Sequence, residues 1–528
     1  MGNRPLYLTL SIRALLACVF VGAVGGCDSK PAQEKPVRPI PIHTIRIVYP
    51  LEARPLMLRA VERFNSKNLP LSNGSLARLS GASFDDNAAA SMIGTPPYEA
   101  SLWIPPLSPL TSFVHGTSKG DIEVGDCQPL MGARLGVALR HIDAFTLPVK
   151  RETLSLSSVL PSREISNRAS PVVLVGNPRF SSSGLLALLM ATAEVKNIPV
   201  EQVSPEVVST SKESLAQRQE RVRSYFIFDH QALGWLAARE GGDPIYVVTT
   251  DQALKAFQAQ NRNSSLEWVP FASLAPFLDY PLCDLISKDE SAEDLEVDKL
   301  ARSFFSSSEF KTLASEAGFS SPPTNPSKQS DSVGRAIQEL FNSWLQIRKP
   351  AKTTFVVDTS IKTDKTTMET IRRELMLFTE SRSSKDDGIA IVSASSDQEV
   401  SRELTSDPEL VRIAISRLTT TGGNAIRDGI ETALSILEDT SPREFRRTVV
   451  VFTSANDTSS QTTVEHLTNR ASQLVGRKNL ELFVLAIGTS EQEFGELPAL
   501  TRKVGGTFEL TDIPSLPSTF YPITRRVQ

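Results

Sequence analysis

The sequence contains few of the residues on which catalytic and metal sites most often depend. Among 528 residues there are five histidines and four cysteines. The histidines stand far apart, at positions 43, 115, 141, 230 and 466, so no two have the i, i+4 spacing of metal ligands on a helix. Neither a Cys-x-x-Cys pair nor a phosphate-binding Gly-x-x-x-x-Gly-Lys motif is present. We therefore expect a protein that is not an enzyme.

Charge of one sign is not in excess either. The 56 lysines and arginines and the 60 aspartates and glutamates are mixed along the chain, for a formal net charge of −4. No basic face is predicted, so we expect no nucleic-acid partner. Hydrophobic residues make up 40% of the chain. A chain of this length should divide into two or three domains, because a single core stops growing beyond about 250–300 residues.

The apolar run at the N-terminus is shorter than the ~20 residues that a membrane-spanning helix needs. It extends from Ala14 to Val24, follows Arg4 and Arg13, and ends in small residues before Cys27. This order is typical of a secretory signal, with a transmembrane anchor as the alternative.

The ending VGGC resembles the lipobox of bacterial lipoproteins. The resemblance implies that residues 1–26 are removed and that Cys27 is acylated, which would anchor the protein to a membrane of the bacterial cell envelope. In a Gram-negative host, Asp28 resembles a signal for retention at the periplasmic face of the inner membrane. Residues 27–42 are polar and contain prolines, and we interpret them as a lipidated tether.

Two cysteines lie outside the export segment, Cys127 and Cys283. In an oxidising compartment an even pair forms a disulfide, and the alternative is two buried free thiols. The sequence leaves both interpretations open.

Residues 43–319 alternate short apolar runs with amphipathic segments, the pattern of an α/β protein whose helices cover sheets. The predicted strands include TIRIVY, RLGVALR, PVVLVGNP and DPIYVVTTD. The order resembles that of type II periplasmic substrate-binding proteins, through the segments AVERFNSKN, YEASLWIPPLSPL and NPRFSSSGLLALLMATAEV. The resemblance implies a domain of two lobes with a ligand pocket between them.

The turn FSSSG is the candidate ligand-binding site of this region. A helix that begins here would present unpaired backbone N–H groups and the positive end of its dipole, and the serines would add hydroxyl donors. Such a turn would suit a small anionic ligand, an oxyanion or a carboxylate. The alternative is that a serine caps the helix and no ligand binds. The candidate residues are Arg179, Ser181, Ser182, Ser183 and Gly184.

A second α/β region follows a break in the pattern. Residues 320–332 are rich in Pro, Ser and Asn, which is typical of a linker. Residues 333–350 predict an amphipathic helix that docks on a neighbouring domain. From 351 to 516 strands and helices alternate again, and the strands RTVVVFTS and LELFVLAIG are continuous apolar runs, as in parallel sheets covered on both faces. Residues 517–528 are expected to form a C-terminal tail.

The order of elements in residues 351–516 resembles the von Willebrand factor A domain, a doubly wound, Rossmann-like α/β fold. The joining of such a domain to a substrate-binding-like domain resembles a group of bacterial lipoproteins. In the A-domain family, a metal-ion-dependent adhesion site lies at the carboxyl ends of the strands. Its first loop is Asp-x-Ser-x-Ser, its second loop supplies a threonine, and its third loop, of the form Thr-Asp-Gly, supplies an aspartate.

Three of the five ligand positions of that site are changed in this chain. The first loop, DTSIKT, keeps Asp358 and Ser360 but has Lys362 in place of the second serine. Asn424 stands at the threonine position and Ser454 at the aspartate position. The resemblance therefore implies a degenerate metal site.

We expect no cofactor at this site, and Mg²⁺ is disfavoured. One carboxylate has been lost and an ammonium gained, whereas Mg²⁺ demands near-ideal octahedral geometry. Lys362 would instead pair with Asp358 and keep the loop folded. If a metal does bind, the expected ligands are Asp358, Ser360 and Asn424, with Asp457 as a rescuing carboxylate.

The leading hypothesis is a lipid-anchored extracytoplasmic binding protein. Its A domain would contact an envelope protein partner, and its two-lobed domain would bind a ligand or a partner. One alternative is an oxyanion receptor of an ABC transporter, and another is an envelope scaffold with both sites degenerate. The expected contact face of the A domain is formed by Asp358, Ser360, Asn424 and Ser454.

Overall fold

The computed structural model describes most of the chain beyond residue 39. The described residues are 40–84, 88–93, 100–117, 122–161, 172–238, 244–272, 277–287, 289–322, 331–381, 386–396, 398–440, 444–476 and 480–527. The expected signal peptide, Cys27 and Asp28 lie outside the described residues, as does most of the expected linker. Within the ranges given, no helix is both long enough and apolar enough to cross a membrane.

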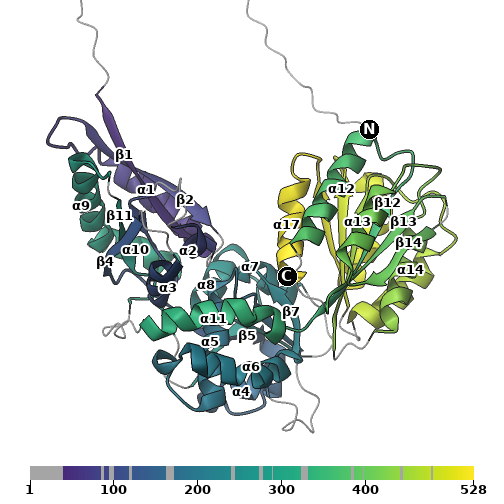
Figure 1. Cartoon of the computed structure of the whole chain (residues 1–528), viewed down its shortest axis with the longest axis horizontal. Helices are drawn as coiled ribbons and strands as arrows, with labels where there is room; N and C mark the ends of the chain where they lie inside the picture. Colours follow the sequence, from purple (N-terminus) through teal and green to yellow (C-terminus); the bar gives the residue numbers. More distant parts are fainter. Residues whose placement is uncertain are drawn as a thin grey trace, which may run out of the picture. The chain divides into compact units, whose positions relative to one another are not determined.

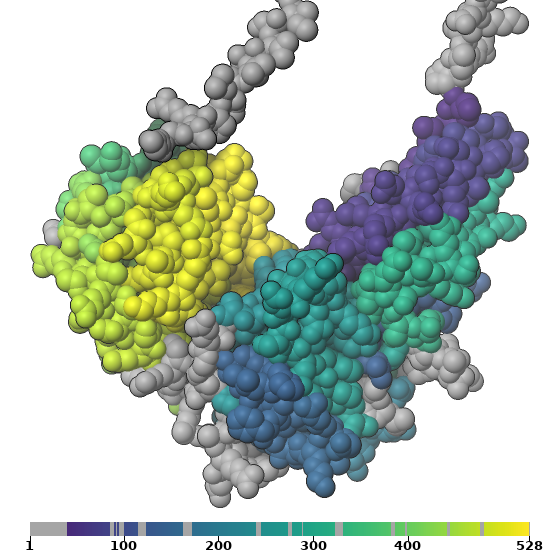
Figure 2. Space-filling model, turned by 180° about the vertical axis from the view of Figure 1, so that it is seen from behind, coloured from purple at the N-terminus to yellow at the C-terminus, as the bar shows by residue number. Residues whose placement is uncertain are grey.

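The first lobe, residues 42–128 and 282–317, is built on a sheet with the strand order β2-β1-β3-β11-β4 (Figure 1). β1 pairs in parallel with β2 and β3, whereas β11 runs antiparallel to β3 and β4. Figure 2 shows the purple N-terminal part of this lobe beside blue-green residues from later in the chain, and α9 contacts β1. The elements are β1 (Ile42–Pro50), α1 (Arg54–Ser66), β2 (Leu76–Phe84), α2 (Ala88–Met92), β3 (Leu102–Trp103), α3 (Pro109–Thr117), β4 (Ile122–Gln128), β11 (Leu282–Ser287), α9 (Ala292–Ser306) and α10 (Ser308–Glu316).

A disulfide ties the returning strand of this lobe to its neighbour. Cys127 of β4 and Cys283 of β11 face each other in the strand register and are bonded, across a sequence separation of 156 residues. The structure therefore contains the disulfide and not the two free thiols.

The second lobe, residues 133–278, has the strand order β10-β5-β8-β6-β7, with β9 also paired to β5. The predicted strands RLGVALR, PVVLVGNP and DPIYVVTTD are confirmed as β5, β6 and β8. The elements are β5 (Ala133–Arg140), α4 (Leu156–Val159), β6 (Val172–Gly176), α5 (Ser182–Lys196), α6 (Pro205–Gln219), β7 (Val222–Phe226), α7 (Asp229–Ala237), β8 (Ile245–Thr250), α8 (Asp251–Gln260), β9 (Leu266–Pro270) and β10 (Phe277–Leu278).

Helix α11 (Asp331–Ile347) is the expected amphipathic helix, and it packs on α3 of the first lobe. The Ser112 hydroxyl of α3 donates a hydrogen bond to Asp331 at 3.1 Å. The rings of Phe113 and Phe341 meet edge to face, with centroids 5.7 Å apart.

The same helix also packs on α6 of the second lobe. Glu339 forms an ion pair with Lys212 of α6 at 2.8 Å. Trp344, which is 1% exposed, meets the ring of Tyr225 edge to face at 5.1 Å. One continuous hydrophobic core contains residues of both lobes and of α11. Helix α11 thus acts as a strap, that is, a single helix that packs on both lobes and holds them together.

The C-terminal domain, residues 351–527, contains a sheet in the order β14-β13-β12-β15-β16-β17. All pairs are parallel except β13 with β14. This is the doubly wound order, in which the chain reverses direction across the sheet beside its first strand. The elements are β12 (Ala351–Asp358), α12 (Lys365–Glu380), β13 (Gly388–Ala394), β14 (Gln398–Thr405), α13 (Pro408–Ser416), α14 (Ile426–Glu438), β15 (Arg446–Thr453), α15 (Val464–Ala471), β16 (Leu480–Ile487), α16 (Leu497–Lys503), β17 (Thr507–Thr511) and α17 (Leu516–Val527).

Both faces of this sheet are covered, as the continuous apolar strands predicted. Successive strand residues point to opposite faces, so Val356 joins the core under α14, α15 and α16, whereas Phe355 joins the core under α12, α13 and α17. All eight residues of β15 are buried.

The polar segment EVSRELTS forms most of the antiparallel edge strand β14. One expectation about this domain is wrong. Residues 517–528 were expected to be a tail, yet up to residue 527 they belong to α17. Leu516, Phe520 and Ile523 of this helix are buried in the domain core, which is why the segment is ordered as a helix.

Candidate functional site

The candidate site lies at the end of strand β12, where the strand order of the C-terminal sheet reverses. β12 is flanked by β13 on one side and β15 on the other. Open α/β sheets bind ligands beside the carboxyl ends of the strands at such a switch point. Asp358 is the last residue of β12, and it is 0% exposed.

The carboxylate of Asp358 accepts hydrogen bonds from the chain itself. Its Oδ1 accepts from the backbone N–H of Ser360 at 2.9 Å. Its Oδ2 accepts from the Asn424 amide at 3.0 Å and from the Thr453 hydroxyl at 3.2 Å. The N–H and the hydroxyl of Ser454 also donate to Oδ2, at 3.0 and 3.2 Å. These donors stabilise the negative charge in place of a cation.

Asn424 turns its amide nitrogen, and not its oxygen, towards the carboxylate. The nitrogen also donates to the carbonyl of Ala455 at 3.0 Å. The amide oxygen accepts from the backbone N–H of Ile426 at 3.0 Å, at the start of α14. The oxygen through which an asparagine would bind a cation is therefore used to hold the helix.

The residues present do not fit a divalent cation. The Ser360 hydroxyl is buried and has no hydrogen-bond partner among the described residues, so this atom alone would suit an added ligand. Mg²⁺, however, takes six oxygen ligands in near-ideal geometry. Oδ2 of Asp358 instead faces the Asn424 amide and the Ser454 hydroxyl, and this hydroxyl is already shared with Thr363 at 2.7 Å.

The expected ion pair between Lys362 and Asp358 is wrong. Lys362 is exposed, whereas the buried carboxylate is already surrounded by neutral donors, so the ammonium stays in water. Asp457 does not reach the site either. Its carboxylate accepts from the backbone N–H of Arg427 at 2.8 Å and pairs with the Arg427 guanidinium at 3.3 Å.

The exposed rim of the site is formed by residues other than those predicted. Ile361, in the first loop, is 71% exposed, and Lys362 follows it. Sequence reasoning overlooked Ile361, although an aliphatic residue in a polar loop was the available signal. The residues of the expected contact face are buried or half-buried: Asp358, Ser360, Asn424 and Ser454.

Backbone bonds between loops hold Ile361 in place. Its N–H donates to the carbonyl of Gly422 at 3.1 Å, and the N–H of Thr421 donates to the carbonyl of Thr359 at 2.7 Å. Gly422 has a φ of +60°, a conformation that favours glycine. The rim is therefore a fixed surface built from two loops.

The serine turn of the second lobe is closed. Ser181, Ser182 and Ser183 are each at most 2% exposed. Ser181 caps α5 by accepting from the N–H of Gly184 at 3.2 Å, and Ser183 donates to the carboxylate of Asp229 at 2.9 Å. The cavity beside Gly184 has a volume of about 10 Å³, the space of at most one water molecule. A carboxylate of the chain thus lies where an anionic ligand was expected.

Helix α17 covers the residues that precede this turn. The side chain of Asn177 donates to the carbonyl of Arg525 at 2.8 Å, and the Arg525 guanidinium lies 4.4 Å from the centre of the Phe180 ring. Burial lowers the pKa of Arg179, and the nearby charges of Arg525 and Arg348 lower it further. Arg179 therefore lies among other arginines of the chain.

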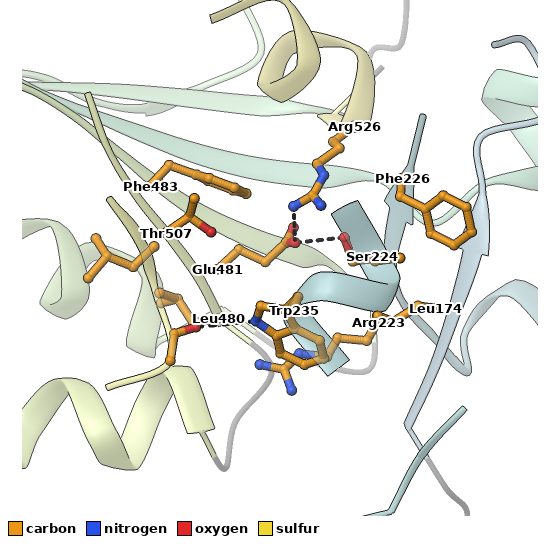
Figure 3. Close-up of a pocket in the computed structure, with 13 residues that line it drawn as sticks. Leu174, Arg223, Ser224, Phe226, Trp235, Leu480, Glu481, Phe483, Thr507 and Arg526 are labelled. Atoms are coloured by element: carbon orange, nitrogen blue, oxygen red, sulfur yellow. Dashed lines mark hydrogen bonds and ion pairs between the residues drawn. The ribbon is translucent and has the colours of Figure 1, made fainter. Parts of the chain in front are cut away.

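The second lobe and the C-terminal domain also meet along β7 and β16 (Figure 3). Glu481 accepts from the Ser224 hydroxyl at 2.6 Å and pairs with Arg526 at 3.7 Å. The Arg223 guanidinium lies 5.2 Å from the centre of the Trp235 ring. The cavity between these side chains measures about 30 Å³, which is too small for a ligand larger than a few waters.

Residues 353–456 match the family model for the von Willebrand factor type A domain. The chain is similar to the solved structure of a von Willebrand factor type A protein from Catenulispora acidiphila, with 18% identity and a TM-score of 0.30, over 34% of this chain and 42% of that chain. It is also similar to the solved structure of the conserved hypothetical protein BatB from Bacteroides thetaiotaomicron, with 12% identity and a TM-score of 0.27, over 33% of this chain and 96% of that chain.

A further similarity concerns the two-lobed region. The structure of the periplasmic binding protein AfuA from Actinobacillus pleuropneumoniae has 11% identity and a TM-score of 0.43, over 58% of this chain and 99% of that chain. No curated protein sequence matches the chain. The chain is therefore a mixed α/β protein whose C-terminal sheet has the doubly wound, Rossmann-like strand order, and residues 353–456 of this domain match the von Willebrand factor type A model.

Proposed function

We propose that the chain is a lipid-anchored binding protein of the bacterial envelope, whose A domain binds a protein partner without a metal ion. The observation that carries the proposal is the set of hydrogen bonds around Asp358. Donors from Asn424, Thr453 and Ser454 fill the space around Oδ2 and keep the three loops together. A metal-free site of this kind is permanently formed, so binding does not depend on the supply of cations.

The exposed rim supplies the contact. Ile361 offers apolar area and Lys362 offers a positive charge, while the floor beneath them is rigid. An apolar side chain that is already held in place loses little conformational entropy on binding, which favours affinity. We expect the partner to present an apolar recess beside a carboxylate.

The anchor and the location complete the proposal. Cys27 carries the lipid, residues 27–42 act as the tether, and the protein faces the periplasm from the inner membrane if the host is Gram-negative. The disulfide between Cys127 and Cys283 supports an oxidising compartment.

The alternative of an oxyanion receptor has less support. It requires space at the serine turn, but Ser183 already bonds to Asp229 and the turn is buried. It also requires lobes that move apart, whereas α11 straps them. Replacement of Ser182 and Ser183 by bulky residues would test it, because anion binding should then be abolished.

The test uses the chain from Asp28 to Gln528 as bait for envelope extracts in chelator and in Mg²⁺. We expect a protein to be captured equally in both conditions. Ile361→Asp and Lys362→Glu should each weaken capture at least tenfold, because both side chains are solvent-exposed parts of the rim. Leu377→Asp is the matched control, since Leu377 is a 52% exposed apolar residue on α12.

Two outcomes would count against the proposal. Equal capture by the wild type and by both rim variants would show that Ile361 and Lys362 do not form the contact face. Native mass spectrometry that shows a tightly bound divalent ion on the wild type, absent from the denatured sample, would overturn the metal-free site.

A further inference from the structure

A cavity lies in the A domain at the same edge of the sheet as the Asp358 site. It is bounded by the start of α14, the loop after β15, the first turn of α15 and the segment between β16 and α16. Its volume is about 150 Å³. This is smaller than a typical small-molecule site of about 300–1,000 Å³, but an apolar cavity of about this size accommodates a benzene-sized group.

Five of the ten residues that line the cavity are large and apolar, and the others are polar, charged or glycine. Phe494, Leu497 and Leu500 are at most 8% exposed and belong to the core under α14, α15 and α16. Val464 is half-buried, at the first residue of α15, and packs against that core. The lining residues are Ile426, Arg427, Asn456, Asp457, Val464, Phe494, Gly495, Glu496, Leu497 and Leu500.

The mouth of the cavity is fixed by a close approach of two loops. Gly495 has a φ of +57°, and a Cβ atom placed there would lie 2.6 Å from Oδ1 of Asn456. A larger residue would strain this backbone conformation and would displace the Asn456 side chain.

The rim of the cavity carries an excess of negative charge. Arg427 is neutralised by its ion pair with Asp457 at 3.3 Å. Glu496 is exposed, and among the described residues its side chain has no hydrogen bond or ion pair, because the nearby Arg502 pairs with Glu491 instead. An incoming group with a positive charge would therefore find a carboxylate in water beside the apolar cavity.

We infer that this cavity receives one aliphatic or aromatic side chain of the protein partner, next to a Lys or Arg that pairs with Glu496. The inference rests on the proposed function and states what the partner presents to the A domain. The loop before α14 joins the rim of the Asp358 site to the cavity: the N–H of Ile361 donates to Gly422 of this loop, and Ile426 and Arg427, which follow it, line the cavity. One partner segment can therefore cover both.

The test is selection of a displayed library of random peptides against the chain from Asp28 to Gln528. We expect the enriched peptides to share an apolar residue adjacent to Lys or Arg. Their affinity should fall at least tenfold for Val464→Trp, which fills the cavity from a half-buried position. It should also fall at least threefold for Glu496→Lys, an exposed change that leaves the fold intact.

The matched control is Glu403→Lys, because Glu403 is exposed on the outermost strand β14, whereas the cavity lies on the other side of β12, next to β15 and β16. The control should bind the peptides as the wild type does. Failure to enrich any peptide, or peptides that bind all variants equally, would overturn the inference. Capture of the envelope partner separates the two proposals: if Ile361→Asp loses the partner and Val464→Trp keeps it, the proposed function stands and only the cavity inference fails.

Discussion

Asp358→Asn tests whether hydrogen bonds have replaced the metal. The carboxylate accepts the N–H of Ser360 at one oxygen and the N–H of Ser454 at the other. Whichever way the new amide is turned, its NH₂ faces one of these buried N–H groups. Hydrogen bonds to a charged group contribute about 1.5–3 kcal/mol, and an unsatisfied buried donor costs about 1–3 kcal/mol. We expect a loss of about 3 kcal/mol in the local stability of the domain.

Hydrogen exchange of the β12 amides, measured in chelator, reports this loss. A change of about 3 kcal/mol corresponds to a roughly 150-fold fall in protection where exchange follows opening of the domain. Asp364→Asn is the control, because Asp364 caps α12 through the N–H of Thr367 at 2.7 Å and asparagine caps equally well. The reasoning is refuted if Asp358→Asn leaves protection unchanged in chelator, and the wild type gains protection from Mg²⁺ that the variant lacks.

Three further predictions follow from other parts of the molecule. Trp344→Ala should lower the stability of the two-lobed region by about 3–5 kcal/mol in urea unfolding, because it removes a buried ring from α11 that packs on Tyr225. A loss below about 1 kcal/mol would contradict the conclusion that α11 holds the two lobes together. Replacement of Cys127 and Cys283 by alanine should cost about 2–4 kcal/mol, and reductant should then have no further effect on the unfolding midpoint. Burial, with nearby Arg446, lowers the pKa of Lys349 to about 8. In the unfolded chain the lysine keeps its proton to about pH 10.4, so the free energy of unfolding should rise between pH 8 and 10.4. Lys349→Met should remove that rise. A variant with the same pH profile as the wild type would refute the assignment of the rise to Lys349.

The strap formed by α11 bears on the function of the two-lobed region. Hinged binding proteins close around a solute by moving one lobe against the other. Here one helix is bonded to α3 of the first lobe and to α6 of the second, within one continuous core. Opening would have to break these contacts, so we expect the two lobes to keep their relative arrangement.

The sequence determined the class of fold, because hydrophobic periodicity depends only on residue order. Apolar runs such as RTVVVFTS predicted buried parallel strands, and the spacing in residues 333–350 predicted the amphipathic helix. The edge strand β14 was missed because QEVSRELT is polar and gains its pairing only from β13. Helix α17 was missed because its apolar residues, Leu516, Phe520 and Ile523, become a core face only against strands far away in the sequence.

The sequence also identified Asp358, Asn424 and Ser454 as parts of one site, through their positions in the loop pattern. It left undecided which atoms of Asn424 face the carboxylate, and it misplaced Lys362, because such choices depend on which donors surround a buried oxygen. Likewise, the serine turn has the composition of an anion site, but the carboxylate of Asp229 and the cover by α17 come from distant segments. Local patterns fixed which groups are present, and tertiary packing decided which of them remain open to a partner.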